Sequence, residues 1–144
     1  MKKIIAIVLL FALLLLLCSC ATKVTVTLPE NITKISVSWN GGPLTTFSYT
    51  DPEKISNLVQ YFTSLELSNT REDPMQYNGG GWVITIETEV GSFGMHHYGN
   101  LFFKTIDGKW WEIPYAQAVA FESLLMDNIP DVLPQNEHAN MWSE

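Results

Sequence analysis

Two glutamates near the middle of the chain, Glu87 and Glu89, come closest to the spacing that acid–base chemistry requires. In an extended strand both side chains lie on one face, about 6.6 Å apart, and carboxylates at this range can serve as general acid and base. Catalytic carboxylates flank a substrate, however, whereas these two point the same way. A solvated outer face of a sheet is therefore the favoured interpretation, and a hydrolase, or an inhibitor of one, is the alternative.

Histidines offer a second possible chemistry, the binding of a metal ion. His96 and His97 are adjacent, so a strand directs them to opposite faces and they cannot hold one ion together without a bulge. His138, Met141 and Trp142 near the C-terminus carry groups that suit copper(I), but three such residues in a polar tail are more often there by chance. Neither set predicts a metal or a cofactor, and a metal-binding role is a further alternative.

Aromatic residues indicate a binding surface rather than a catalytic one. Trp110 and Trp111 are adjacent in a predicted strand, so they face opposite sides of the sheet. If Trp111 packs into the core, Trp110 points outward, and Tyr98 and Phe102 share its face in a suitable register. An exposed aromatic patch of this kind often marks a ligand or partner surface. The alternative is that a loop such as 68–81 covers this second face of the sheet.

The first 20 residues predict an export signal. Lys2 and Lys3 supply a positive start, and an apolar run of 14 residues follows from Ile4 to Leu17. This run is short for a membrane-spanning helix, which needs about 20 residues, and its length suits a cleaved signal. A retained N-terminal anchor is the alternative.

The residues that end this segment, Leu17-Cys18-Ser19-Cys20, resemble the lipobox of bacterial lipoproteins. The resemblance implies that the Cys20 sulfur receives diacylglycerol and that a peptidase then removes the signal peptide, residues 1–19. Cys18 fits less well as the acceptor, because two leucines precede it where small residues are expected. Two acyl chains on one residue give stable anchoring, so the resemblance implies a protein on the extracytoplasmic face of the cell membrane.

Removal of this signal peptide changes the charge of the chain. It leaves 6 basic against 15 acidic residues, a net charge of −9. Nucleic acids and anionic lipid headgroups both attract basic surfaces, so neither is an expected partner. Both cysteines lie at or before position 20, so the exported part can form no internal disulfide and has no free cysteine nucleophile. Because no serine lies in a Gly-x-Ser-x-Gly elbow either, an enzyme is not the favoured class.

About one hundred residues, 32–129, have the length of a single domain that must position these side chains. Alternating apolar residues within 35–49 predict a β-hairpin. Either Thr50 or Asp51 can cap the helix that follows, with Glu53 completing a capping box with Thr50. The helix carries an apolar stripe at helical spacing, formed by Ile55, Leu58, Val59, Phe62 and Leu65.

A four-strand meander is predicted over residues 82–113. Its third strand covers 101–106 and its fourth covers 109–113, with Asp107-Gly108 as a two-residue turn. A second helix begins at Pro114, and its predicted apolar stripe is Ala118, Phe121, Leu125 and Ile129. The predicted fold is therefore α+β, a mainly antiparallel sheet in the order ββ-α-ββββ-α, with two helices packed on one face.

Two flanking segments complete the chain. Residues 20–31 contain the alternation Val24 to Leu28, which predicts either an extra strand or a free extended tether. In the first case only three or four residues separate the domain from the lipid. Residues 130–144 are polar and contain proline, so they are predicted to be poorly ordered.

Three segments of the domain resemble small lipoproteins of Gram-positive bacteria, over about residues 32–129: 48–55, 78–86 and 107–113. The resemblance implies placement on the outer face of the cytoplasmic membrane and carries no activity. We therefore expect a membrane-tethered binding module with a possible binding patch of Tyr98, Phe102 and Trp110. Its partner, besides the membrane that holds its lipid, would be another envelope protein, a peptide or a glycan.

Overall fold

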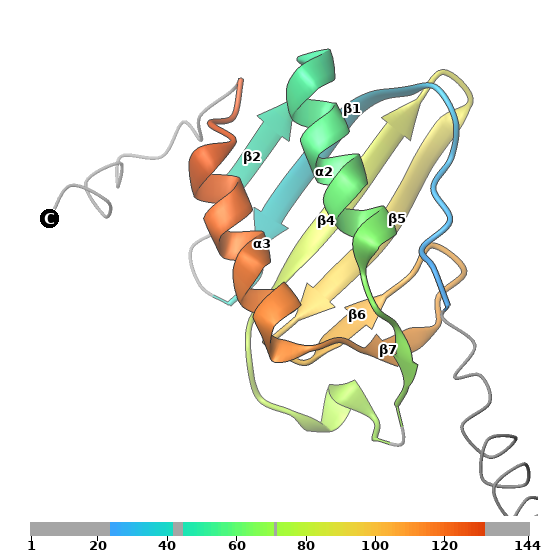
Figure 1. The fold of residues 1–144 in the computed structure, drawn as a ribbon, viewed down its shortest axis with the longest axis vertical. Coiled ribbons are helices and arrows are strands. Elements are labelled where there is room, and N and C mark those ends of the chain that lie inside the picture. The colour runs from blue at the N-terminus through green and yellow to red at the C-terminus, as the bar shows by residue number, and fades with distance from the viewer. Residues whose placement is uncertain (1–23, 42–44, 71, 132–144) are drawn as a thin grey trace, which may run out of the picture.

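The computed structural model describes residues 24–41, 45–70 and 72–131. Within this part of the chain, seven antiparallel strands form one sheet, and two helices lie side by side across one of its faces (Figure 1). The predicted α+β class and its order ββ-α-ββββ-α are confirmed, with one short strand added after the first helix. No helix among the described residues is long and apolar enough to cross a membrane.

The strands lie across the sheet in the order β2-β1-β4-β5-β6-β7-β3. Their bounds are β1 Ile32–Trp39, β2 Thr45–Tyr49, β3 Ser68–Asn69, β4 Gly81–Thr88, β5 Gly91–Tyr98, β6 Phe102–Lys104 and β7 Trp110–Glu112. The helices are α2 Pro52–Ser64 and α3 Tyr115–Asp127, and a short 3-10 turn, η1 Pro74–Gln76, lies between β3 and β4. Since β1 pairs with both β2 and β4, the meander β4 to β7 continues the sheet that the first hairpin begins.

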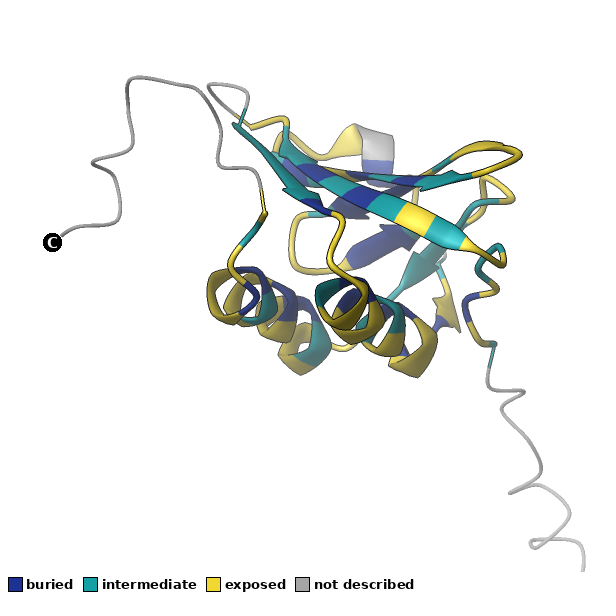
Figure 2. Cartoon of the chain, turned by 90° about the horizontal axis from the view of Figure 1, so that it is seen from above, coloured by how far each residue is buried: buried dark blue, intermediate teal, exposed yellow. Residues whose placement is uncertain are grey.

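The hydrophobic core fills the space between the sheet and the helices, as the dark blue residues in Figure 2 show. Strand residues of alternating position supply one side of it, and the apolar stripes of both helices supply the other. The largest fully buried side chains include Tyr49, Phe62, Phe103 and Phe121. Neither α2 nor α3 lies on the opposite face of the sheet, so the side chains there that the β3–β4 connection leaves uncovered are available for contacts outside the domain.

Helix α2 begins where the sequence predicted, and Asp51 rather than Thr50 is its N-cap. The Asp51 Oδ1 accepts hydrogen bonds from the N–H groups of Glu53 and Lys54, at 3.0 and 3.1 Å. The predicted capping box with Thr50 is wrong, because the Thr50 N–H and hydroxyl both donate to Asp131 instead.

Helix α3 ends two residues before the predicted stripe does. Ala118, Phe121 and Leu125 are buried as predicted, but Ile129 lies beyond the helix and is 65% exposed. Asn128 is buried in its stead, and its Nδ2 donates to the Lys54 carbonyl at 3.1 Å. A buried amide needs such a partner. The hydrogen bond from Asn128 to α2 therefore stabilises the end of helix α3 at Asp127.

The strands β6 and β7 are shorter than predicted, and five residues connect them instead of two. The Thr105 N–H donates to the Lys109 carbonyl at 3.0 Å, and the Gly108 N–H donates to the Thr105 carbonyl at 2.9 Å. Gly108 has a φ of 83°, a conformation that favours glycine. The predicted Asp107-Gly108 turn is therefore the tip of a wider loop.

The segment before β1 is part of the domain and not a free tether. Val24 forms an isolated antiparallel bridge with Leu67, and Val26 is 4% exposed within the core. Neither predicted alternative holds as stated, because these residues pack against the domain but form a single bridge rather than a strand of the sheet.

Glycines explain how the indole of Trp39 fits at the end of the sheet. A Cβ added to Gly41 or to Gly80 would lie 2.4 or 2.5 Å from the Trp39 Cζ2 atom. The Trp39 ring also contacts Trp82, with 5.0 Å between centroids. Gly80, just before β4, and Gly41 therefore provide space for a packed indole.

Candidate functional site

The predicted aromatic residues of the sheet's outer face lie together. Strand pairing aligns His96 with Lys104 and Lys104 with Trp110, and aligns Tyr98 with Phe102 in the adjacent row. The ring centroids of Tyr98 and Trp110 are 6.2 Å apart, and those of His96 and Trp110 are 5.7 Å apart. We call His96, Tyr98, Phe102 and Trp110 the outer aromatic patch.

The direction of the two tryptophans agrees with the predicted alternation. Trp111 packs against the core on the helix side, and its Nε1 donates to the Thr105 hydroxyl at 3.1 Å. Trp110 points to the other side and is half-buried. The Lys104 Nζ lies 5.6 Å from the centroid of the Trp110 ring, a distance typical of a cation–π contact.

Part of the patch is covered by the connection between β3 and β4. The ring of Tyr77 lies 5.6 Å from that of Phe102, and Phe102 is only 4% exposed. The Tyr98 hydroxyl donates to the Tyr77 carbonyl at 2.5 Å and fixes this cover. An exposed patch and a face covered by the loop 68–81 were the two predicted alternatives, and each holds in part. Phe102 is covered, while Tyr98 and Trp110 remain half-exposed.

His96, which was not predicted to belong to the patch, lies between Tyr98 and Trp110 and contacts both rings. Its Nε2 is 3.3 Å from the Asn40 Nδ2, and its ring lies 5.6 Å from that of Tyr98. Partial burial, and then the nearby Lys104 ammonium, lower the pKa of His96 below its ordinary value. The imidazole is thus mainly neutral at pH 7. Its position on this face was predictable, because His96 lies two residues before Tyr98 in the same strand.

Glu87 and Glu89 do not form the predicted pair. Strand β4 ends at Thr88, so Glu89 lies in the turn before β5. The Glu87 Oε1 accepts from the Lys34 Nζ at 3.0 Å, which makes Glu87 one half of an ion pair between neighbouring strands. The prediction that both carboxylates share a strand face is wrong, because the chain turns one residue too early.

His97 points to the opposite face from His96, as predicted, and is 2% exposed. Its imidazole is stacked on Phe121 of α3, and burial lowers its pKa to about 4. His97 is thus a neutral part of the core. Among the described residues, no group of three or more His, Cys, Asp or Glu side chains could hold a metal ion; His138, Met141 and Trp142 lie outside those residues.

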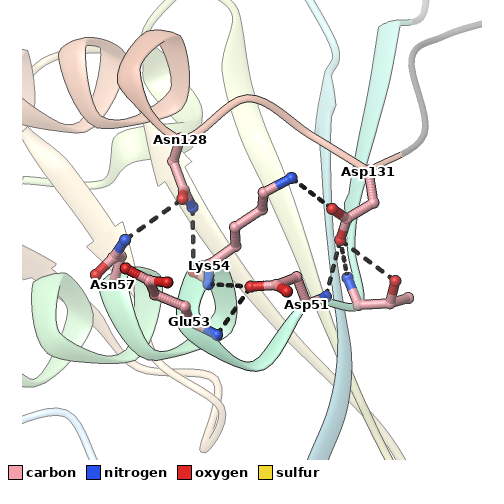
Figure 3. A network of polar contacts seen from close by, with 7 residues as sticks. Asp51, Glu53, Lys54, Asn57, Asn128 and Asp131 are labelled. Carbon is pink, nitrogen blue, oxygen red and sulfur yellow. Dashed lines mark hydrogen bonds and ion pairs between the residues drawn. The ribbon is translucent and has the colours of Figure 1, made fainter.

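A cluster of polar contacts joins the segment after α3 to the start of α2 (Figure 3). The Asp131 Oδ2 accepts from the N–H groups of Thr50 and Asp51, at 2.6 and 2.8 Å, and its Oδ1 accepts from the Lys54 Nζ at 2.5 Å. The Lys54 ammonium and these N–H groups hold the pKa of Asp131 well below its ordinary value. Because backbone N–H groups and the Lys54 ammonium already occupy both carboxylate oxygens, we assign this cluster to stability. Asp131 belongs to the described residues, although 130–144 was predicted to be poorly ordered.

The predicted lipidation site, Cys20, and the leader 1–19 lie outside the described residues. Comparison of the chain with known protein families, with curated protein sequences and with solved structures finds no match. The leader sequence and the outer aromatic patch are therefore the features of the chain that bear on its function.

Proposed function

We propose that the protein is a lipoprotein anchored by a diacylglyceryl group on Cys20, and that its domain is a binding module. The outer aromatic patch is its contact surface, and its ligand is an envelope protein, a peptide or a glycan. The observation that carries this proposal is that Tyr98, His96 and Trp110 lie together, half-exposed, on the face that the helices leave open. Half-exposed aromatic side chains are enriched at binding surfaces because they combine large apolar area with few rotatable bonds.

The packed segment before β1 makes the anchor short. Because Val24 bridges Leu67, the lipidated Cys20 would be four residues away from a fixed point of the domain. Four extended residues span at most about 14 Å. The binding surface would therefore act within a domain's diameter of the membrane, and its ligand would have to reach that layer.

The alternative functions receive less support from the positions of their residues. Glu87 is held by Lys34, and His96 and His97 lie on opposite faces of the sheet. Neither arrangement brings two candidate groups to one substrate or ion. The binding module is therefore the function that the described side chains favour.

Acylation tests the first half of the proposal. Cells that express the chain would be fed an alkyne-labelled fatty acid, and label on the protein would be compared among the wild type, Cys20→Ala and Cys18→Ala. We expect Cys20→Ala to lose the label and the membrane association, and Cys18→Ala to keep both. Label that persists in Cys20→Ala would contradict the assignment of the anchor.

Binding tests the second half. Solubilised envelope material would be passed over the immobilised wild type, Trp110→Ala and the control Tyr115→Ala, which removes a tyrosine that is 65% exposed on α3. We expect Trp110→Ala to retain at least tenfold less material, while Tyr115→Ala behaves as the wild type. Equal retention by all three proteins would eliminate the patch as the contact surface.

A further inference from the structure

The outer face of the sheet extends the aromatic patch into an array of hydroxyl groups. Strand pairing aligns one row across six strands: Thr46, Ser38, Val83, His96, Lys104 and Trp110. The neighbouring row holds Ser48, Ser36, Thr85 and Gly94. Strands are about 4.8 Å apart, so the first row spans about 24 Å. Aromatic rings thus lie at one end of a long surface and hydroxyls at the other.

These hydroxyls can still bond a ligand. The Ser36 and Ser48 oxygens are 3.3 Å apart, and the Ser38 and Thr46 oxygens are 2.9 Å apart. A hydroxyl has one donor and two acceptor positions, so each pair keeps one free O–H and several lone pairs. Between the hydroxyls and the patch, a Cβ built on Gly94 would meet no atom within 4 Å, which leaves the surface open at that point.

The charges of the strand residues on this face balance. Its strand residues include Lys34 and Lys104 against Glu87 and Glu112, and the first lysine is paired with Glu87 at 3.0 Å. The exported chain as a whole has 6 basic and 15 acidic residues, so this neutral face differs from the average surface. A neutral face offers no net attraction to a charged ligand, so its charge favours no charged ligand over an uncharged one.

We propose that the outer face binds an uncharged polysaccharide chain. The inference rests on the proposed binding function and deepens it by naming the ligand class. Sugar rings would stack on Trp110 and Tyr98, while their hydroxyl groups bond Ser36, Ser38 and Thr85. Protein interfaces contain an apolar core, whereas Val83 is the one large apolar side chain in these two rows outside the patch. The combination of hydroxyl rows with aromatic rings therefore fits a sugar polymer better than a protein.

The test uses the full lipidated chain in lipid nanodiscs and three uncharged hexasaccharides: β-1,4-linked N-acetylglucosamine, β-1,4-linked glucose and α-1,4-linked glucose. Binding would be measured by calorimetry and by saturation-transfer NMR. We expect saturable binding of at least one of them, at least tenfold weaker in Trp110→Ala. Thr85→Val, which replaces only a hydroxyl by a methyl group, should weaken it about threefold to tenfold. Ser123→Ala, at an exposed position of α3, should have no effect.

Three outcomes would overturn the polysaccharide proposal: no hexasaccharide binds, Trp110→Ala binds as well as the wild type, or a poly(glycerol phosphate) chain binds more tightly than every neutral chain. The envelope-capture experiment separates this failure from that of the proposed function. If captured material depends on Trp110 while no hexasaccharide binds, the binding module stands and its ligand class is wrong. If capture is also independent of Trp110, both proposals fail.

Discussion

The imidazole of His97 lies nearly parallel to the ring of Phe121, with 5.1 Å between centroids and 13° between planes. This contact joins the middle of the sheet to α3, and His97 also meets the edge of Phe103 at 6.2 Å. A histidine in this position can pack like an aromatic hydrocarbon only while it is neutral. The attachment of α3 therefore depends on the protonation of one core residue.

Acid should destabilise the domain through His97. Its pKa is about 4 in the folded protein against an ordinary 6.5, so the unfolded chain binds a proton more readily between these values. The neutral form of His97 contributes about 3 kcal/mol to the free energy of unfolding. This contribution is fully present above pH 6.5, decreases as the pH falls and is lost by about pH 4. Urea unfolding at a series of pH values measures it. His97→Phe should lose this part of the pH dependence, and an unchanged slope in that variant would contradict the assignment.

Asp131 should stabilise the junction of β2, α2 and α3. Its carboxylate accepts from the Thr50 and Asp51 N–H groups and from Lys54, so Asp131→Asn removes the ion pair and is expected to lower the Tm by several degrees. Because the pKa of Asp131 is lowered in the folded state, this stabilisation is present above the ordinary pKa and disappears as pH falls below it. Thermal unfolding followed by circular dichroism measures both effects. Asp127→Asn, at the exposed end of α3, is the matched control and should not lower the Tm.

Gly80 should tolerate no side chain. A Cβ there would lie 2.6 Å from the Gly41 Cα as well as 2.5 Å from the Trp39 ring, and overpacking of this kind costs about 1–3 kcal/mol. Gly79→Ala is the control, because a Cβ at Gly79 meets no atom within 4 Å. Urea unfolding should show a loss of stability in Gly80→Ala alone. Equal stabilities of the two variants would mean that the Trp39 indole is not confined as described.

The segment before β1 should detach when Val26 becomes charged. Val26 is 4% exposed, and an unpaired carboxylate in the core is strongly unfavourable, so Val26→Asp should release the segment from the domain. Amide hydrogen exchange of residues 24–28 would rise at least tenfold. Thr25→Asp, at the exposed neighbouring position, should leave exchange unchanged. Fast exchange in the wild type itself would contradict a packed segment.

Patterns with a local physical cause were predictable from the sequence. Asp51-Pro52 marked the start of α2, because a capping carboxylate and a proline at N1 act within one turn. The alternation around Trp110 and Trp111 gave their opposite directions, because a strand has a period of two. The same rule predicted that His96 and His97 face opposite sides of the sheet, but not which of the two is buried.

Features made by contacts distant in sequence were not predictable. Strand β3 has only two exposed residues, Ser68 and Asn69, and no apolar alternation; it exists because β7 offers an open edge. The cover of Phe102 by Tyr77 depends on where a loop packs. The burial of Asn128 in place of Ile129 likewise depends on a partner in α2.

If the proposed lipid anchor confines the protein to a membrane, the ends of the sheet have a further consequence. An open strand edge can pair with a neighbouring molecule and start a polymer, and membrane confinement raises the frequency of such encounters. On one side, β3 offers only two residues. On the other, the Asp131 N–H occupies the Ser48 carbonyl at 2.9 Å, and the Asp131 carboxylate occupies the Thr50 N–H. Among the described residues, neither border strand, β2 or β3, offers a long row of free backbone groups, so a crowded layer of these domains should polymerise little through these two strands.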